Sequence, residues 1–121
     1  MTEKRAVGIA GEEAAIGWLR SHGFMIMERN WRCGRYEIDI VASRWGVVHF
    51  VEVKTRHEGS LTTPEQAIDD SKRRALRRGA SAYSAMHRMS GDVQFDLAAV
   101  TVGDDGALTV RYIENAIEYG W

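Results

Sequence analysis

Apolar residues recur at helical spacing in two segments of the chain. In residues 6–21 they return every three or four positions, and a second such segment runs from about residue 63 to 86. Thr63 is suited to cap this second segment, with Pro64 at the first helical position and Gln66 completing a capping box. The pattern therefore predicts two helices.

Five shorter segments are rich in β-branched and aromatic residues and predict strands. They are residues 24–31, 36–42, 47–55, 93–102 and 108–113. Short turns separate the first three, which predicts an antiparallel meander, and the second helix then crosses over to a parallel fourth strand. The predicted fold is a single α/β (α+β) domain over residues 1–121, a mixed β-sheet flanked by helices in the order α-β-β-β-α-β-β.

Composition narrows the class of protein. The 121 residues are 45% hydrophobic and 27% charged, values typical of one globular domain. The single cysteine, Cys33, rules out an internal disulfide and a cysteine-based zinc site. No apolar run is long enough to cross a bilayer, and the charged first residues do not resemble a secretory signal. We therefore expect a cytoplasmic protein with no membrane partner.

The net charge of −1 conceals an uneven distribution along the chain. Residues 1–88 hold 15 basic residues against 11 acidic ones, whereas residues 89–121 hold one basic residue and six acidic ones. The basic region is compatible with a polyanionic partner but does not require one.

Charged residues lie on a predicted apolar face of the third strand. Side chains alternate along a strand, so Val48, Phe50, Glu52 and Lys54 share one face. A carboxylate and an ammonium beside Phe50 are costly on a buried strand unless something compensates their desolvation. A simple Glu52–Lys54 ion pair at the wet end of the strand explains the pattern equally well.

The second strand carries two further acids. Within residues 37–40, Glu37 and Asp39 are expected to point to one side of the strand and the two isoleucines to the other. A hairpin with the third strand sets Asp39 opposite Val51 or Glu52, depending on the length of the turn. Two carboxylates held together repel each other unless a cation or a proton lies between them. We interpret Asp39 as a site residue and Glu37 as part of a solvated face.

The first helix supplies another acid on its apolar stripe. Ile9, Glu12, Ile16 and Leu19 follow the i, i+3, i+7, i+10 spacing of one helical face. An acid on the core side of a helix is costly unless it is paired or bound to a metal. The alternative is that Glu12 reaches past the small Ala15 to a surface arginine.

The second helix carries basic residues on two sides. Its predicted inward face includes one lysine and consists of Ile68, Lys72, Ala75, Gly79, Tyr83 and Met86. Its outer surface holds Arg73, Arg74, Arg77 and Arg78 with no acid among them. These guanidiniums repel one another, and phosphate contacts would relieve the repulsion, although a solvated basic helix explains the run equally well. We predict that nucleic acid contacts Arg56, Lys72, Arg73, Arg74, Arg77 and Arg78.

Together the three acids suggest a site for a metal ion that prefers oxygen ligands. Glu12, Asp39 and Glu52 offer the ligands that Mg²⁺ or Mn²⁺ prefers, with Lys54 beside them. Such an ion can polarise a phosphoryl oxygen and lower the pKa of bound water. Lys54 could orient the attacking water or stabilise the charge of the transition state.

At these residues the chain resembles a known group of nucleases. Asp39, followed by Glu52-Val53-Lys54, is similar to the D…(D/E)-x-K signature of the restriction-endonuclease-like, PD-(D/E)XK, superfamily. The resemblance narrows to the YraN family, small bacterial proteins similar to archaeal Holliday-junction resolvases. The matching features are Gly8-x-x-Gly11-Glu12-x-x-Ala15, Gly23-Phe24, Arg29-Asn30, Glu37-Ile38-Asp39-Ile40, Phe50-Val51-Glu52-Val53-Lys54-Thr55-Arg56, Lys72 and Phe95-Asp96.

The resemblance implies an α-β-β-β-α-β core, a metal site, and a homodimer, because relatives often dimerise. The implied catalytic residues are Glu12, Asp39, Glu52 and Lys54. Two positions depart from the pattern: Ile38 occupies the proline position of the superfamily, and Tyr36 stands where relatives usually carry glycine. We expect Tyr36 to reshape the turn that starts at Gly34 and to affect substrate access there.

Three hypotheses of function remain open at this point. The first is a Mg²⁺-dependent endonuclease acting on DNA rather than RNA, with branched or single-stranded DNA as its substrate. The second is a nucleic-acid-binding module that keeps the nuclease fold without turnover. The third is a structural adaptor in which the acids and lysines form only internal ion pairs.

Overall fold

The computed structural model describes residues 3–63 and 65–116 of the chain. Its elements are α1 (Glu3–Ser21), β1 (Met25–Cys33), β2 (Tyr36–Arg44), β3 (Val47–His57), the 3₁₀ helix η1 (Glu65–Ala67), α2 (Asp70–Met86), β4 (Val93–Val102) and β5 (Leu108–Ile113). The predicted order α-β-β-β-α-β-β is confirmed, and η1 is an addition to it. Pro64, predicted at a first helical position, lies outside the described residues.

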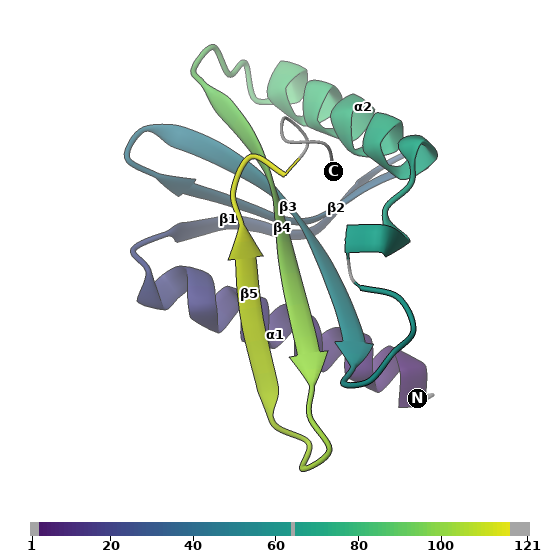
Figure 1. Ribbon diagram of the computed structural model, residues 1–121. Coiled ribbons are helices and arrows are strands. Elements are labelled where there is room, and N and C mark those ends of the chain that lie inside the picture. Colours follow the sequence, from purple (N-terminus) through teal and green to yellow (C-terminus); the bar gives the residue numbers. More distant parts are fainter. Residues whose placement is uncertain (1–2, 64, 117–121) are drawn as a thin grey trace.

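The strands form one mixed sheet in the order β1-β2-β3-β4-β5 (Figure 1). β1, β2 and β3 pair antiparallel as a meander, β3 and β4 pair parallel, and β5 returns antiparallel to β4. α2 makes the crossover from β3 to β4, as the sequence predicts. Parallel neighbours need such a crossover, because a tight turn reverses the direction of the chain and can join only antiparallel strands.

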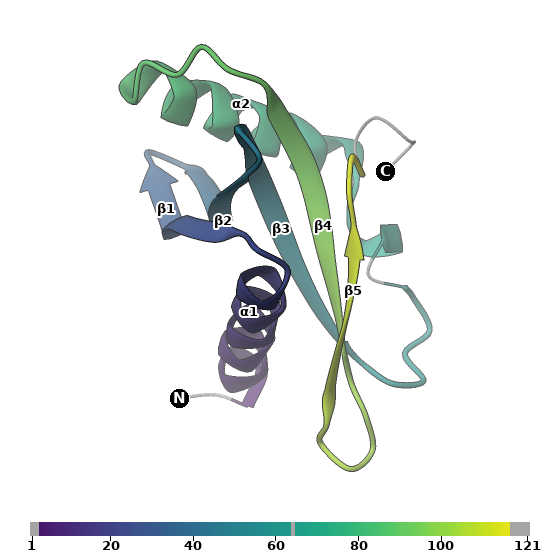
Figure 2. The ribbon, with the colours of Figure 1, turned by 90° about the vertical axis from the view of Figure 1, so that its left-hand side faces the viewer.

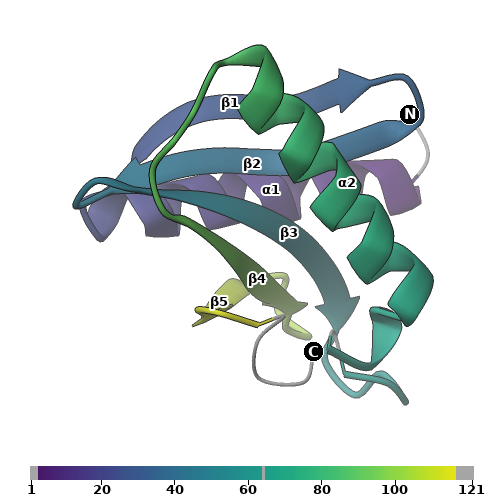
Figure 3. The ribbon, with the colours of Figure 1, turned by 90° about the horizontal axis from the view of Figure 1, so that it is seen from above.

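The two helices cover opposite faces of the sheet (Figures 2 and 3). Side chains from α2 and the sheet form one core cluster, which includes Phe50, Leu76 and Tyr83. Side chains from α1 and the other face form a second cluster, which includes Leu19 and Val51. The middle of β3 is therefore buried on both faces, with Phe50 in the cluster under α2 and Val51 in the cluster under α1.

The predicted apolar stripe of α1 is wrong at its first position. Ile9 is 42% exposed, whereas Ala15, Ile16 and Leu19 are buried. Ile9 instead lines a pocket, together with the other α1 residues Glu3, Lys4, Arg5, Val7, Gly8 and Glu12. None of the helices in the described ranges, 3–63 and 65–116, is both long and apolar enough to span a membrane.

The second predicted helix is two elements instead of one. Thr63 and Gln66 exchange the hydrogen bonds of a capping box, at 2.8 and 3.2 Å, but this box opens only the short η1. α2 has its own cap, since Asp69 is extended and its carboxylate accepts a bond from the Lys72 N–H at 2.8 Å. The predicted inward position of Met86 is also wrong, because this residue is 61% exposed at the end of α2.

Gly11 is the point of closest approach between α1 and β3. A Cβ atom at this position would collide with the Thr55 side chain, chiefly with its hydroxyl oxygen. Because the collision is with a residue of the central sheet, relief requires the helix to move. Gly11 therefore sets the distance at which α1 holds its neighbour Glu12 over the sheet.

We predict that Gly11→Ala lowers the free energy of unfolding by about 1–3 kcal/mol, the usual cost of overpacking. Urea denaturation measures this change, and Thr55→Ala should recover part of it by removing the opposing hydroxyl. The control is Gly17→Ala on the same helix, where an added Cβ has nothing within 4 Å. There alanine should be neutral or stabilising by up to about 1 kcal/mol. Equal losses at the two glycines would contradict this account.

Candidate functional site

β2 and β3 separate in the middle of the sheet. Their antiparallel ladder ends with Ile40 opposite Val51. Beyond that pair β2 continues beside β1, while β3 continues to His57 beside β4 (Figure 3). The two strands therefore leave each other at the residues that the register places next, Asp39 and Glu52.

Asp39 takes the place of the missing ladder bond. Its Oδ2 accepts a hydrogen bond from the Val53 N–H at 2.9 Å. The predicted alternation of residues 37–40 is wrong here, because Ile38 belongs to the core cluster under α2 and Ile40 to the cluster under α1. The change of face accompanies the departure of β2 from its ladder with β3. The carboxylate of Asp39 is thereby held against the backbone of β3.

Glu52 is almost completely buried beside Asp39, with 2% of its surface exposed. Its Oε1 lies 3.3 Å from the Lys72 Nζ and 4.0 Å from the Lys54 Nζ. Its Oε2 is buried and has no hydrogen-bond partner among the described residues. A buried polar atom without a partner is costly, so this oxygen is suited to receive a ligand.

Burial makes both carboxyls harder to ionise. Burial, with a further contribution from the charge of Asp39, raises the pKa of Glu52 to about 7, although Lys72 and Lys54 oppose the shift. Burial also raises the pKa of Asp39, against the opposing hydrogen bond from Val53 and the charge of Lys72. Burial is the first cause of both shifts, so these two carboxyls ionise less readily than exposed ones.

Glu12 approaches the same site from α1. Burial, together with the charge of Asp39, raises the pKa of its carboxyl, and a hydrogen bond with the Asn30 side chain opposes this shift. Asn30 lies in β1 with a φ of 51°, a left-handed conformation that asparagine tolerates better than most residues. Asn30 was not among the predicted site residues, and only the family resemblance at Arg29-Asn30 marked its position.

All four predicted catalytic residues line one pocket of about 930 Å³. They are Glu12, Asp39, Glu52 and Lys54, joined by Lys72 and Arg56 from the predicted nucleic-acid-binding set. The ligand oxygens of the three acids do not all lie within 4.8 Å of one another, in a comparison restricted to residues 3–63 and 65–116. Binding one ion through all three acids would therefore require their side chains to draw together.

The arginines of α2 divide into two groups. Arg73 forms an ion pair with Asp70. The prediction that none of the four arginines has an acidic neighbour is therefore wrong for Arg73. The i, i+3 spacing of the pair on one helix was the available signal. Arg74, Arg77 and Arg78 are exposed and take part in no ion pair within the described part of the chain.

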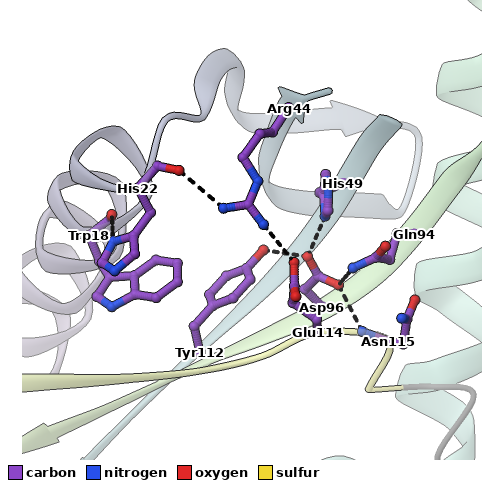
Figure 4. Close-up of polar contacts among 9 residues, drawn as sticks. All are labelled: Trp18, His22, Arg44, His49, Gln94, Asp96, Tyr112, Glu114 and Asn115. Atoms are coloured by element: carbon purple, nitrogen blue, oxygen red, sulfur yellow. Dashed lines mark hydrogen bonds and ion pairs between the residues drawn. The ribbon is translucent and has the colours of Figure 1, made fainter. Parts of the chain in front are cut away.

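A second polar cluster, which the sequence did not reveal, surrounds Asp96 of β4 (Figure 4). Asp96 is fully buried and accepts four hydrogen bonds, two on each oxygen. The donors are the His49 ring, the Tyr112 hydroxyl, the Gln94 amide and the backbone N–H of Asn115. These bonds connect β3, β4 and β5 with the segment that follows β5.

The Asp96 cluster is better explained as a structural tie than as a metal site. Ligand atoms of His49, Asp96 and Glu114 do lie within 4.8 Å of one another. However, Asp96 already accepts four bonds, and Glu114 is held by Arg44 at 3.0 Å. A carboxylate has about four lone-pair positions, so Asp96 has none left for a cation.

Removing the Asp96 carboxylate should destabilise the fold. We predict that Asp96→Ala lowers the free energy of unfolding by about 3 kcal/mol or more, because four donors lose their acceptor inside the protein. Chemical denaturation followed by tryptophan fluorescence measures the loss. Glu13→Ala is the control, since its ion pair with Arg29 is exposed and should contribute at most about 1 kcal/mol. Similar losses for the two variants would contradict this interpretation.

The raised pKa of Glu52 predicts a pH-dependent stability. Its pKa rises from 4.5 to about 7 on folding, so the folded state binds a proton that the unfolded state releases. This contribution is complete below pH 4.5 and is lost as the pH rises through 7, a total of about 3 kcal/mol at most. Glu52→Gln should lack the dependence. Unfolding in EDTA from pH 5 to 8 should therefore show wild type losing stability relative to Glu52→Gln, and a constant difference would contradict the prediction.

Comparison with known proteins identifies the relatives of this chain. Residues 11–100 match the "Uncharacterised protein family UPF0102". A UPF0102 protein of Bacteroides thetaiotaomicron is 39% identical over 116 residues, 96% of this chain and 95% of the relative. One of Porphyromonas gingivalis is 41% identical over 96% of this chain and 87% of the relative, and one of Symbiobacterium thermophilum is 44% identical over 93% and 96%. The chain belongs to UPF0102, the YraN family that its motifs resemble.

Proposed function

We propose that this protein is a metal-dependent nuclease that hydrolyses phosphodiester bonds of DNA. One observation carries the proposal. The buried carboxyl of Glu52 and the half-buried one of Asp39 meet with Lys54 where β2 and β3 separate, and one Glu52 oxygen has no partner among the described residues. Glu52 lines the pocket, so a cation there could bind this unpartnered oxygen, and the D…E-x-K pattern supports a nuclease.

The residues of the pocket fit a divalent metal ion. Asp39 and Glu52 supply carboxylate oxygens, and Glu12 supplies a third, a donor set that suits Mg²⁺ or Mn²⁺ better than zinc. The unpartnered Glu52 Oε2 is the atom that most needs such a ligand. When bound, the ion would supply Lewis acidity at a phosphoryl oxygen and lower the pKa of a water molecule.

The lysines would have separate roles around the reacting phosphate. Lys54 lies on the same face of β3 as Glu52 and is 27% exposed, so its ammonium can reach both the acid and a substrate in the pocket. There it would orient the attacking water or stabilise the negative charge that develops on phosphorus oxygens. Lys72, on α2, would balance the charge of Glu52, from which it lies 3.3 Å.

Contacts to the DNA backbone would come from the basic residues around the pocket. Arg56 lines the pocket itself, while Arg74, Arg77 and Arg78 lie exposed on α2. Phosphate contacts position a nucleic acid but do not read its sequence, so we infer binding without base specificity. The preference for DNA over RNA, and for branched or single-stranded forms, rests on the resemblance to resolvases.

The main alternative is a nucleic-acid-binding module that has the fold without turnover. One observation favours it: the oxygens of Glu12, Asp39 and Glu52 do not all lie within 4.8 Å of one another. Lys72 is also an internal partner for Glu52, as the adaptor hypothesis expects. The binding module predicts that Asp39 can be replaced without loss of DNA affinity, whereas the adaptor assigns the acids only to internal ion pairs.

Cleavage assays test the proposal directly. Duplex, single-stranded, forked and four-way DNA should be incubated with the protein and Mg²⁺ or Mn²⁺, and we expect cleavage of at least one substrate. Glu52→Gln should slow this cleavage by about 100-fold or more, because it removes a charge at the reacting centre. Glu13→Gln, an exposed acid of α1, should be unaffected. If wild type and Glu52→Gln are equally inactive on every substrate, the enzymatic proposal fails.

Metal binding separates the remaining hypotheses. Calorimetric titration with Mn²⁺ should show saturable binding that Asp39→Asn abolishes. A binding module without turnover would instead lose DNA affinity in Arg74→Ala plus Arg77→Ala and remain indifferent to Asp39→Ala. An adaptor would bind neither Mn²⁺ nor DNA.

A further inference from the structure

A smaller pocket lies beside α2, away from the carboxylates. Its volume is about 340 Å³, and it is lined by Arg35, Tyr36, Ser71, Arg74, Ala75 and Arg78. No residue of this pocket lines the larger one. Arg35 and Tyr36 were not among the predicted nucleic-acid-binding residues, so they add to that set.

The fold builds this pocket by bringing the β1–β2 turn against α2. Gly34, with a φ of 59°, turns the chain between the two strands, and Tyr36 follows at the start of β2. On the helix, Gly79 leaves room for the strand: an added Cβ there would lie 3.4 Å from the Cβ of Tyr36. This close packing fixes the Tyr36 backbone beside α2, with the pocket next to it.

Three guanidinium groups meet in the pocket without a carboxylate among its lining residues. Hydrogen bonding from Arg35, together with the charges of Arg35 and Arg78, lowers the pKa of the Tyr36 hydroxyl. The charge of Arg74 acts on Asp70, but Asp70 lies outside the pocket and is already paired with Arg73. Like charges gathered in this way repel one another, and a bound anion would relieve the repulsion.

The groups that line the pocket favour binding of a phosphate over stacking of a nucleic-acid base. Arg35 lies over the Tyr36 ring at 5.6 Å from its centroid, so this face of the ring is already covered. The remaining groups are the hydrogen-bond donors Arg74, Arg78 and Ser71. Ser71 is in the first turn of α2, where the helix dipole adds positive potential.

We propose that this pocket binds a phosphate of the nucleic-acid backbone other than the one that is cleaved. This inference rests on the proposed function for its choice of ligand. Lys72 lines the larger pocket and its neighbour Ser71 lines the smaller one, so the two sites flank the first turn of α2. A strand that crosses this turn would contact both, and the smaller pocket would set its position over the carboxylates.

Binding measurements on two adjacent arginines test the proposal. Fluorescence anisotropy of a labelled single-stranded DNA oligonucleotide should be recorded in EDTA, where no divalent metal supports cleavage, over a range of KCl concentrations. Arg78→Ala should weaken binding several-fold and reduce the magnitude of the salt slope by about 0.7. Arg77→Ala is the matched comparison, since it removes the same charge from the same helix outside the pocket, and it should weaken binding less than Arg78→Ala does.

Three outcomes would overturn the proposal. The first is an equal effect of Arg78→Ala and Arg77→Ala on affinity and slope, which would indicate diffuse attraction to α2. The second is no binding of the oligonucleotide by wild type. The third is displacement of the oligonucleotide by sub-millimolar inorganic phosphate, which would indicate a site for the free ion. If no substrate is cleaved but Arg78→Ala still weakens binding more than Arg77→Ala, the nuclease proposal fails and the proposal for this pocket stands.

Discussion

The hydrogen bond from the Val53 N–H to the Asp39 carboxylate is the constraint on which the site depends. Two central strands of a sheet normally pair along their length, and unpaired backbone groups inside a protein are costly. Here the Asp39 side chain accepts a hydrogen bond from the Val53 N–H, which no longer has a backbone partner on β2. The sheet can therefore open at its centre without losing that bond, and the opening brings Asp39 and Glu52 together from two strands.

The cost of this arrangement is a buried carboxyl, Glu52, whose hydrogen bonding is incomplete within the described part of the chain. Lys54 and Lys72 share one oxygen of Glu52 and leave the other without a partner among the described residues. The Asp96 cluster is built in the opposite way, with every carboxylate lone pair occupied. A fully satisfied network stabilises a fold, whereas an unsatisfied one marks a place where a ligand can bind. The contrast supports a structural role for Asp96 and is the reason for proposing a functional role for Glu52.

Much of the fold followed from local pattern, and the exceptions have physical causes. β4 and β5 begin and end at the predicted residues because turn signals bound their apolar runs. Exposure of Ile9 could not be predicted, since the periodicity of a helix does not reveal where the sheet beneath it ends. Within the site, alternation along β3 placed Glu52 and Lys54 on one face, but the shift of β2 at Asp39 and the meeting of His49 with Asp96 depend on contacts between distant segments.

The central claim is that Glu12, Asp39 and Glu52 together form a divalent-cation site between β2 and β3. The most direct measurement is a crystal structure of the protein grown with Mn²⁺, in which anomalous scattering locates the ion. We expect one strong anomalous peak within ligand distance of Asp39 and Glu52. A peak at the Asp96 cluster alone, or none at all at saturating Mn²⁺, would contradict the claim.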